Sequence, residues 1–174
     1  MDQLIFTEEF CQPENLHPFT LTRQIQDIRV GILTIREKWE LLLGLPSFDK
    51  KEDDYKDLER SVNIDEAIGD GVCFMIHGNV LPTNKLARAI RKLKDGEFLS
   101  TPAGNGIVYR ITKNDIIDRY KIKVGHAVTF REPLQSIQFP WDIFQLNDRA
   151  IRQDFELLTA GRKSEKIPKS NSVI

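Results

Sequence analysis

One stretch decides the fold class: Val72-Cys-Phe-Met-Ile-His77, a continuous apolar run with a glycine at each end. Such a short run between glycines is typical of a strand buried on both faces, as in a parallel sheet. Pro82 and Thr83 then open a predicted helix that closes near Gly96. The apolar face of that helix is formed by Leu86, Ile90 and Leu93. The order strand, turn, helix predicts an α/β fold with an at least partly parallel sheet.

The first part of the chain carries a similar pattern. Residues 3–6 predict a short strand, and the breakers within residues 8–18 predict irregular structure. Apolar residues at helical spacing then predict a helix over residues 28–42, which Gly44 and Pro46 would end. The spaced residues are Ile28, Ile32, Ile35, Trp39 and Leu42.

The second half predicts further strands and a last helix. Residues 97–100 and 106–111 are β-like and joined by a turn-rich linker, which predicts a hairpin. Residues 127–130 and 134–137 are expected to pair in the same way. The last helix would carry apolar residues at helical spacing, namely Phe144, Ile151, Phe155 and Leu158. We expect three aromatic side chains to lie in the core: Trp39, Trp141 and Phe144.

Length and composition exclude several classes of protein. The chain has 174 residues, a net charge of -1, 40% hydrophobic and 29% charged residues, as expected for a globular protein. The balanced charge gives no reason to bind nucleic acid. No apolar run is long enough to span a membrane, and the N-terminus lacks a secretory signal. Cys11 and Cys73 form no disulfide framework, so we expect a reduced, cytoplasmic setting.

The chain divides into one domain and a tail. We expect a single domain over residues 1–160 and a polar, basic linker over residues 161–174. The mixed charge run at residues 49–60 predicts a solvated loop or helix face. The three histidines lack metal-ligand spacing, so no zinc site is expected.

Two blocks of sequence carry a resemblance to a known family. The first is Leu16-His-Pro-Phe-Thr-Leu-Thr-Arg-Gln-Ile-Gln-Asp-Ile-Arg-Val-Gly-Ile-Leu-Thr-Ile-Arg-Glu-Lys-Trp39. The second runs from Trp141-Asp-Ile-Phe144 with Asn147 through Asp154-Phe-Glu-Leu-Leu158 to Gly161-Arg-Lys-Ser164. The chain thereby resembles bacterial sugar nucleotidyltransferases similar to the bifunctional N-acetylglucosamine-1-phosphate uridyltransferase/acetyltransferases.

The resemblance implies a fold and a set of partners. It implies a nucleotide-diphospho-sugar transferase fold, which is Rossmann-like with a mostly parallel central sheet flanked by helices. It also implies a nucleoside triphosphate or a nucleotide sugar as ligand, together with Mg²⁺. In the family a hexapeptide-repeat β-helix usually follows and drives trimerisation, and residues 171–174 resemble its first rung. A homo-oligomer would then form through that later segment, with an acyltransferase activity attached.

The reaction of the family needs groups that this chain partly lacks. Nucleotidyl transfer needs main-chain N–H groups around the phosphates, cationic side chains, and carboxylates for Mg²⁺. Active relatives have a glycine-rich loop after the first strand, but residues 6–13 contain no glycine and two adjacent acids. Ile25 stands where they have lysine, and Asn79 follows Gly78 where they have aspartate. Three departures make a second hypothesis competitive, a non-catalytic binding or assembly module beside an acyltransferase. An unrelated α/β regulatory module is a third.

Three residues are the candidates for phosphate or nucleotide binding: Arg23, Arg29 and Asn79. The two arginines lie near a predicted helix start and would hold phosphates, or would instead pair with Asp27 or Glu37. Asn79 follows a central strand, where open α/β sheets bind ligands, although a turn role is as good an interpretation. No catalytic residue is assigned.

Other polar residues receive structural interpretations. We expect a solvated helix face at Lys85, Arg88 and Lys92. Asp142 is interpreted as a helix N-cap rather than a metal ligand, and His77 as a packed histidine rather than a general base.

Overall fold

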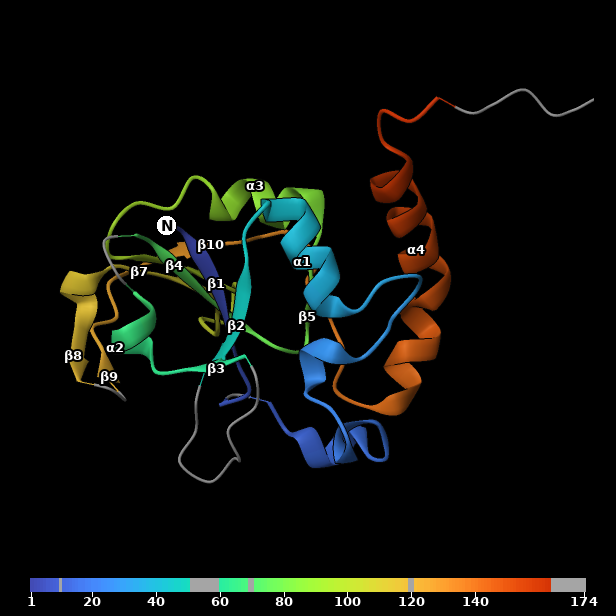
Figure 1. Cartoon of the computed structure of the whole chain (residues 1–174), viewed down its shortest axis with the longest axis horizontal. Coiled ribbons are helices and arrows are strands. Elements are labelled where there is room, and N and C mark those ends of the chain that lie inside the picture. The colour runs from blue at the N-terminus through green and yellow to red at the C-terminus, as the bar shows by residue number, and fades with distance from the viewer. Residues whose placement is uncertain (10, 51–59, 69–70, 119–120, 164–174) are drawn as a thin grey trace, which may run out of the picture.

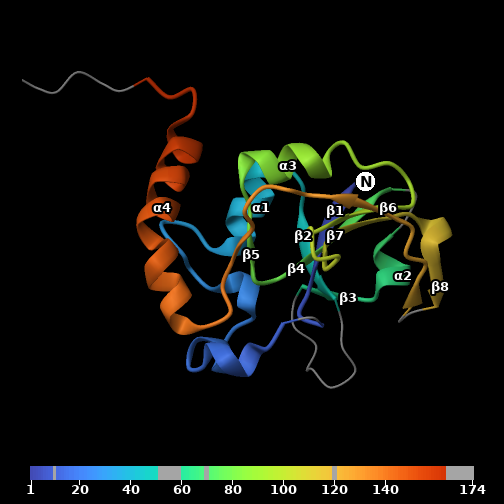
Figure 2. The same ribbon diagram turned by 180° about the vertical axis from the view of Figure 1, so that it is seen from behind.

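The computed structural model describes residues 1–163 apart from residues 10, 51–59, 69–70 and 119–120. A seven-stranded sheet lies at its centre, with helices against it and α4 at the outer flank (Figures 1 and 2). The strands are β1 (Gln3–Thr7), β2 (Ser47–Lys50), β3 (Ser61–Val62), β4 (Cys73–His77), β5 (Val80–Leu81), β6 (Glu97–Ser100), β7 (Gly106–Ile111), β8 (Ile116–Asp118), β9 (Lys121–Ile122), β10 (His126–Thr129) and β11 (Gln135–Ser136). The α-helices are α1 (Ile35–Leu43), α2 (Ile64–Ala67), α3 (Asn84–Ile90) and α4 (Pro140–Thr159). The 3-10 helices are η1 (Pro13–Leu16), η2 (Phe19–Leu21), η3 (Ile25–Asp27) and η4 (Lys113–Asp115).

The sheet is mostly parallel, as the sequence predicts. Its strand order is β10-β6-β7-β4-β1-β2-β3, and only β7 runs antiparallel to its neighbours β4 and β6. In β4 the register places Met75 beside Ile5 of β1, and four of the five residues of the strand are buried. The predicted hairpin is confirmed as β6 and β7.

One predicted pairing is wrong. The strands near residues 127–130 and 134–137 do not pair with each other. Instead β10 lies parallel to β6 at the edge of the sheet, and β11 pairs with β5 in a separate two-stranded ladder. Turn residues alone suggested a local hairpin, but the edge of β6 offers β10 a longer ladder of hydrogen bonds.

The two faces of the sheet bury different side chains. Leu4 and Phe6 of β1 point to the face covered by α1 and α3. Ile5 points to the opposite face, where it packs with residues from α2 and the β8–β9 ladder. Trp39 of α1 is fully buried in the first core and donates a 2.9 Å hydrogen bond to the Val80 carbonyl. The core position predicted for Trp39 is therefore confirmed.

Helix α1 begins later than predicted. Its first residue is Ile35, because Thr34 accepts a hydrogen bond from the Glu37 N–H while Glu37 accepts one from the Thr34 N–H. This capping box is a strong start signal. Gly44, with φ of +69°, ends the helix in the left-handed conformation. Residues 28–34 form a loop in place of the predicted helical turns.

Helix α4 is present as predicted, but the prediction for two of its aromatic side chains is wrong. Trp141 is 55% exposed and Phe144 is 73% exposed. The helix instead buries Ile143, Ala150 and Asp154 against the body of the protein. Phe144 and Ile143 are neighbours in sequence but lie on different sides of the helix, and only the side of Ile143 packs inward.

The charge run is only partly described. Asp49 and Lys50 lie in β2, and Asp49 is 4% exposed, so the prediction of a solvated segment is wrong for this residue. The part of the run at residues 51–59 and the tail at residues 164–174, including the rung-like end, lie outside the described residues. Within the described part of the chain, no helix is long and apolar enough to cross a membrane.

Candidate functional site

The carboxyl ends of three parallel strands meet at one edge of the sheet. β1, β2 and β4 are adjacent and parallel, so residues at the ends of these strands lie side by side. Gly78, directly after β4, donates a 2.9 Å hydrogen bond to the carbonyl of Thr7 at the end of β1. In open α/β sheets ligands bind at this kind of edge, which makes it the candidate site.

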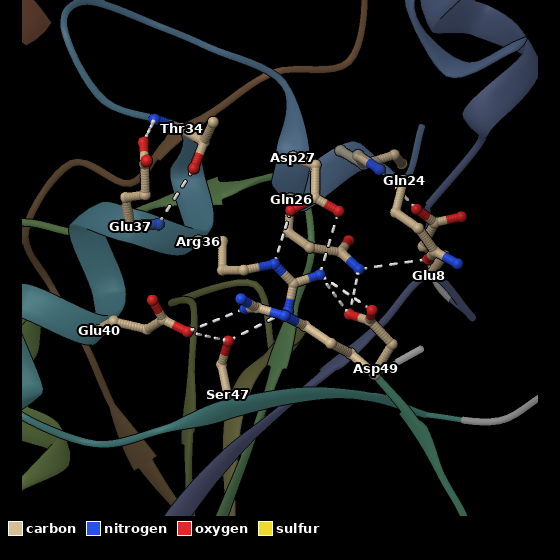
Figure 3. A network of polar contacts seen from close by, with 12 residues as sticks. Glu8, Gln24, Gln26, Asp27, Thr34, Arg36, Glu37, Glu40, Ser47 and Asp49 are labelled. Carbon is tan, nitrogen blue, oxygen red and sulfur yellow. Dashed lines mark hydrogen bonds and ion pairs between the residues drawn. The ribbon is translucent and has the colours of Figure 1, made fainter. Parts of the chain in front are cut away.

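A buried cation organises the edge next to β2 (Figure 3). Arg36 of α1 donates to Asp27 at 2.6 and 3.1 Å and to Asp49 at 2.7 and 2.9 Å. It also donates to the Ser47 hydroxyl at 3.0 Å, and its guanidinium lies over the Phe6 ring. Burial alone would lower the pKa of Arg36, but the hydrogen bond to Asp27 and the charges of Asp49 and Asp27 outweigh it, so the pKa is raised. Arg36 therefore stays charged and holds two carboxylates.

Gln26 connects this network to the end of β4. Its amide Nε2 donates to Asp49 at 2.6 Å, and the side chain is almost fully buried. Its Oε1 lies so close to Gly78 that a Cβ built there would be 2.5 Å away. Within the described residues this oxygen has no hydrogen-bond partner. The Gln26 side chain and the Gly78 turn are thus packed directly together, and a Cβ at residue 78 would displace the Gln26 amide.

The two acids in the loop after β1 are both engaged. Glu8 accepts a 2.7 Å hydrogen bond from the N–H of Ile25, and Glu9 forms a 2.6 Å ion pair with Lys50. The Ile25 side chain is completely buried in the core. Two of the departures that the resemblance implies are therefore in contact, because Glu8 of the acidic loop holds the main chain at Ile25.

Two of the three candidate residues lie close in sequence to the contact between Gln26 and Gly78. Arg23 lies just before η3, is exposed, and makes no hydrogen bond or ion pair with any described residue. Asn79 follows Gly78 in the turn between β4 and β5, is half-buried, and accepts a 2.9 Å hydrogen bond from Ile137 through its carbonyl. Gln26 follows Arg23 by three residues and packs on Gly78, the residue before Asn79.

Arg29 lies elsewhere, in the loop before α1. Its guanidinium donates to the Ile32 carbonyl and stands 4.0 Å from the Glu37 carboxylate. The pairing with Glu37, one of the alternatives for this residue, is thus the one observed. Asp27, the other proposed partner, pairs with Arg36. Arg29 supports the local loop in this conformation.

The other polar candidates take structural roles. Asp142 accepts hydrogen bonds from the N–H groups of Gln138 and Phe139 at 2.8 and 2.9 Å, so it serves the start of α4, although Phe139 is the N-cap residue itself. His77 ends β4 half-buried, with its ring 6.2 Å from that of Tyr109. Burial lowers the pKa of His77, and the charge of Glu9 partly opposes this effect.

The described side chains on α3 and the two cysteines agree with their predicted roles. Lys85 of α3 pairs with Glu132 at 2.8 Å on the surface, and Arg88 and Lys92 are exposed. Cys11 and Cys73 are not joined by a disulfide bond, and burial strongly raises the pKa of the Cys73 thiol.

Sequence reasoning missed the residues that dock α4. Asp154 accepts hydrogen bonds from the N–H groups of Ile32 and Leu33 at 2.8 and 3.0 Å and forms a buried ion pair with Lys38. Asn147, one heptad earlier, accepts a 2.9 Å hydrogen bond from the Gly31 N–H. Two polar residues at this spacing on one helix face were the available signal. Beside the pair lies a cavity of about 220 Å³ between α1, α3 and α4, away from the strand edge.

The carboxylates of the edge do not fit a divalent cation. Asp27 and Asp49 are held by Arg36, Glu8 by a main-chain N–H, and Glu9 by Lys50. No group of three or more His, Cys, Asp or Glu side chains in the described part of the chain could hold a metal ion. The expected Mg²⁺ therefore finds no built carboxylate site among these residues.

The comparisons with known proteins agree with this architecture. A family model described as sugar nucleotidyl transferase matches residues 4–163, which is most of the chain. No curated protein matches the chain.

Proposed function

The chain belongs to the sugar nucleotidyl transferase family, and we propose that it binds a nucleoside triphosphate or nucleotide sugar where β1 and β4 end. One observation carries the proposal. The contact of Gln26 with Gly78 supports it, because Arg23 precedes Gln26 by three residues and Asn79 follows Gly78. Arg23 is an exposed guanidinium without a partner among the described residues, which suits a phosphate. The Asn79 amide offers a donor and an acceptor for a ribose or sugar hydroxyl.

The activity proposed for this site is nucleotidyl transfer. An oxygen of a sugar 1-phosphate attacks the α-phosphorus of the triphosphate, and a new P–O bond forms there. The bond from that phosphorus to the bridging oxygen breaks, so pyrophosphate leaves with the electron pair. Arg23 would stabilise the charge on the phosphate oxygens.

A second candidate function is nucleotide binding without transfer. The acidic loop after β1 favours this second function. Glu8 holds the main chain at Ile25, and the side chain at position 25 is a buried isoleucine rather than a lysine that could bind phosphate. Glu9 adds a second carboxylate next to the place where phosphates would bind. Such a domain would serve as a binding or assembly module beside a hexapeptide-repeat acyltransferase.

Thermal unfolding with a panel of ligands separates these functions. The panel contains nucleoside triphosphates and nucleotide sugars, each with and without Mg²⁺. Ligand at 100 times its dissociation constant adds about 2.7 kcal/mol, which raises Tm by roughly 5–10 °C for a domain of this size. A base-specific shift supports the binding site, and a pyrophosphate-release assay on that nucleotide then distinguishes transfer from binding alone. A flat panel at millimolar ligand contradicts both.

A further inference from the structure

One side of α4 is apolar and exposed. Trp141 is 55%, Phe144 73%, Ile151 42% and Phe155 61% exposed. Together with two further positions these residues follow one another at alternating steps of three and four residues. We call this set the α4 seam: Trp141, Phe144, Asp148, Ile151, Phe155 and Leu158. The 3–4 spacing is that of the contact positions between two packed helices.

The α4 seam is separate from the face by which the helix docks. Residues Ile143, Ala150 and Asp154 bury that face, and at 3.6 residues per turn the seam lies about a third of a turn away. Both ribbon views show α4 at the outer flank of the molecule (Figures 1 and 2). The exposed fractions mean that no described part of the chain covers the seam.

The exposed area matches what a pair of proteins needs. Aromatic side chains carry about 150–250 Å² each, so the exposed fractions leave roughly 400 Å² of apolar surface on the seam. A standard interface buries about 800 Å² per partner, of which about 60% is apolar. A patch of this size, about 300–600 Å², is often the functional one on a monomer.

The charged residues on and next to the seam, Asp148 and Arg152, fit a second copy of the same helix. We propose that two copies of this chain dimerise by packing α4 against α4 in antiparallel orientation. The spacing of the seam is the same in both directions, so Phe144 meets the partner's Phe155, and Trp141 meets the partner's Leu158. In this register Asp148 lies next to the partner's Arg152. Within one chain the two side chains already pair at 3.1 Å but are 80% and 75% exposed. A two-fold axis duplicates that pair across the interface.

The association is measured by sedimentation equilibrium of the whole chain from micromolar to near-millimolar concentration. The expected result is a reversible monomer–dimer equilibrium. Replacing Phe144 and Phe155 together by serine should weaken it by at least about 30-fold, because central aromatic side chains dominate such interfaces. Both residues are exposed, so the variant keeps its fold, which circular dichroism verifies. The matched control is Leu21→Ser, because Leu21 is 66% exposed but lies in η2.

Charge reversal tests the antiparallel register. Asp148→Arg alone and Arg152→Asp alone should each dimerise poorly, since like charges then face one another in the symmetric dimer. An equimolar mixture of the two variants should regain dimerisation, because every pair is again opposite in sign. The loss in each single variant distinguishes the antiparallel register, and recovery in the mixture shows that the partner is a second copy.

Three outcomes overturn the proposal. The first is a wild-type chain that stays monomeric at every concentration, which leaves the seam to another segment or protein. The second is a dimer that persists unchanged in the double serine variant. The third is a mixture of charge variants that remains monomeric. Nucleotide binding in the Proposed function is read by a different assay, so its failure and this one are distinguishable.

Discussion

Lys38 of α1 forms a buried ion pair with Asp154 of α4, which lies 116 residues later in the chain. Both side chains are at most 5% exposed. Burial lowers the pKa of Lys38, and the hydrogen bond to Asp154 only partly offsets this effect. Asp154 also binds the N–H groups of Ile32 and Leu33, so a single carboxylate joins α4, α1 and the loop between η3 and α1.

Removing the Asp154 carboxylate should strongly lower the free energy of unfolding. Asp154→Ala leaves the Lys38 charge and two main-chain N–H groups buried without their partner, so we expect a loss of about 3–5 kcal/mol of unfolding free energy. Urea denaturation measures it. The control is Asp148→Ala on the same helix, which breaks an exposed pair and should cost less than about 1 kcal/mol. Equal losses in both variants would contradict the role given to Asp154.

Gly31 tests the fit between α4 and the loop. Its φ is +87°, and a Cβ built there would lie 2.7 Å from the Asp154 carboxylate and 2.9 Å from Ala150. Gly31→Ala should therefore combine backbone strain with overpacking and cost about 2–4 kcal/mol. Gly104 has a nearly identical φ of +89° but open space around it, so Gly104→Ala should show the strain alone, about 1 kcal/mol. Thermal or urea unfolding of the two variants measures the difference, and equal costs would mean that α4 does not constrain Gly31.

Arg23 tests the nucleotide site. Arg23→Ala should weaken binding of the nucleotide found in the ligand panel by about 10- to 150-fold, the range of a charge-assisted hydrogen bond. Isothermal titration measures this change. Arg88→Ala on the exposed side of α3 removes the same charge elsewhere and should leave affinity unchanged. If Arg23→Ala also binds normally, Arg23 is not a phosphate ligand.

Asn79 tests the expectation of Mg²⁺. An aspartate at this position supplies the carboxylate that Mg²⁺ prefers, so Asn79→Asp should make nucleotide binding stronger in Mg²⁺ than in its absence. Titrations with and without the ion provide the comparison, with Asn84→Asp at the exposed start of α3 as control. A variant without any metal response would remove the idea that residue 79 is an altered metal position.

His77 should make the protein less stable in mild acid. Its pKa in the folded state is lowered by burial, so below pH 6.5 the unfolded chain binds the proton first. Stability therefore falls as the pH drops from about 6.5 toward the lowered pKa. His77→Gln should flatten this part of the Tm-against-pH curve, whereas His126→Gln, at an exposed position, should not. An unchanged slope in His77→Gln would show that other groups cause the loss.

The strands that are buried in the sheet could be predicted, because their sequences are runs of apolar residues. The run at β4 and the hairpin of β6 and β7 are both evident from apolar residues between turn signals. The place of β10 was not predictable, because its exposed residues carry no pattern that selects β6 as partner. Which strand pairs with the edge of the sheet depends on the path of the chain through space, and the local sequence of β10 does not predict that path.

The sequence contains the signal for the true start of α1, but the helical spacing of earlier apolar residues led to a start that is too early. Ile28, Ile32 and Ile35 have helical spacing, yet Gly31 requires a positive φ and Asp154 binds the following N–H groups. The Thr34 and Glu37 pair marks the true start. Similarly, Trp141 and Phe144 satisfy a helical period, but the period alone does not say which side of α4 packs inward.

The candidate site was only partly predictable. Arg23 and Asn79 follow from the resemblance and from the position after a strand, and the structure relates them through Gln26. The buried Arg36 with Asp27 and Asp49 was missed, because the sequence around a charged residue does not show that it will be buried with partners from distant segments.

The pair of Lys38 and Asp154 also determines when the α1 side of the domain can fold during synthesis. When α1 leaves the ribosome, the carboxylate that neutralises its lysine has not yet been made. The nascent chain can form the strands β1, β4 and β7, but Lys38 must stay in water until α4 emerges. Contacts between such distant residues form late and slowly. The nascent domain therefore stays open on the α1 side until α4 has emerged, and chaperones would find exposed apolar surface there.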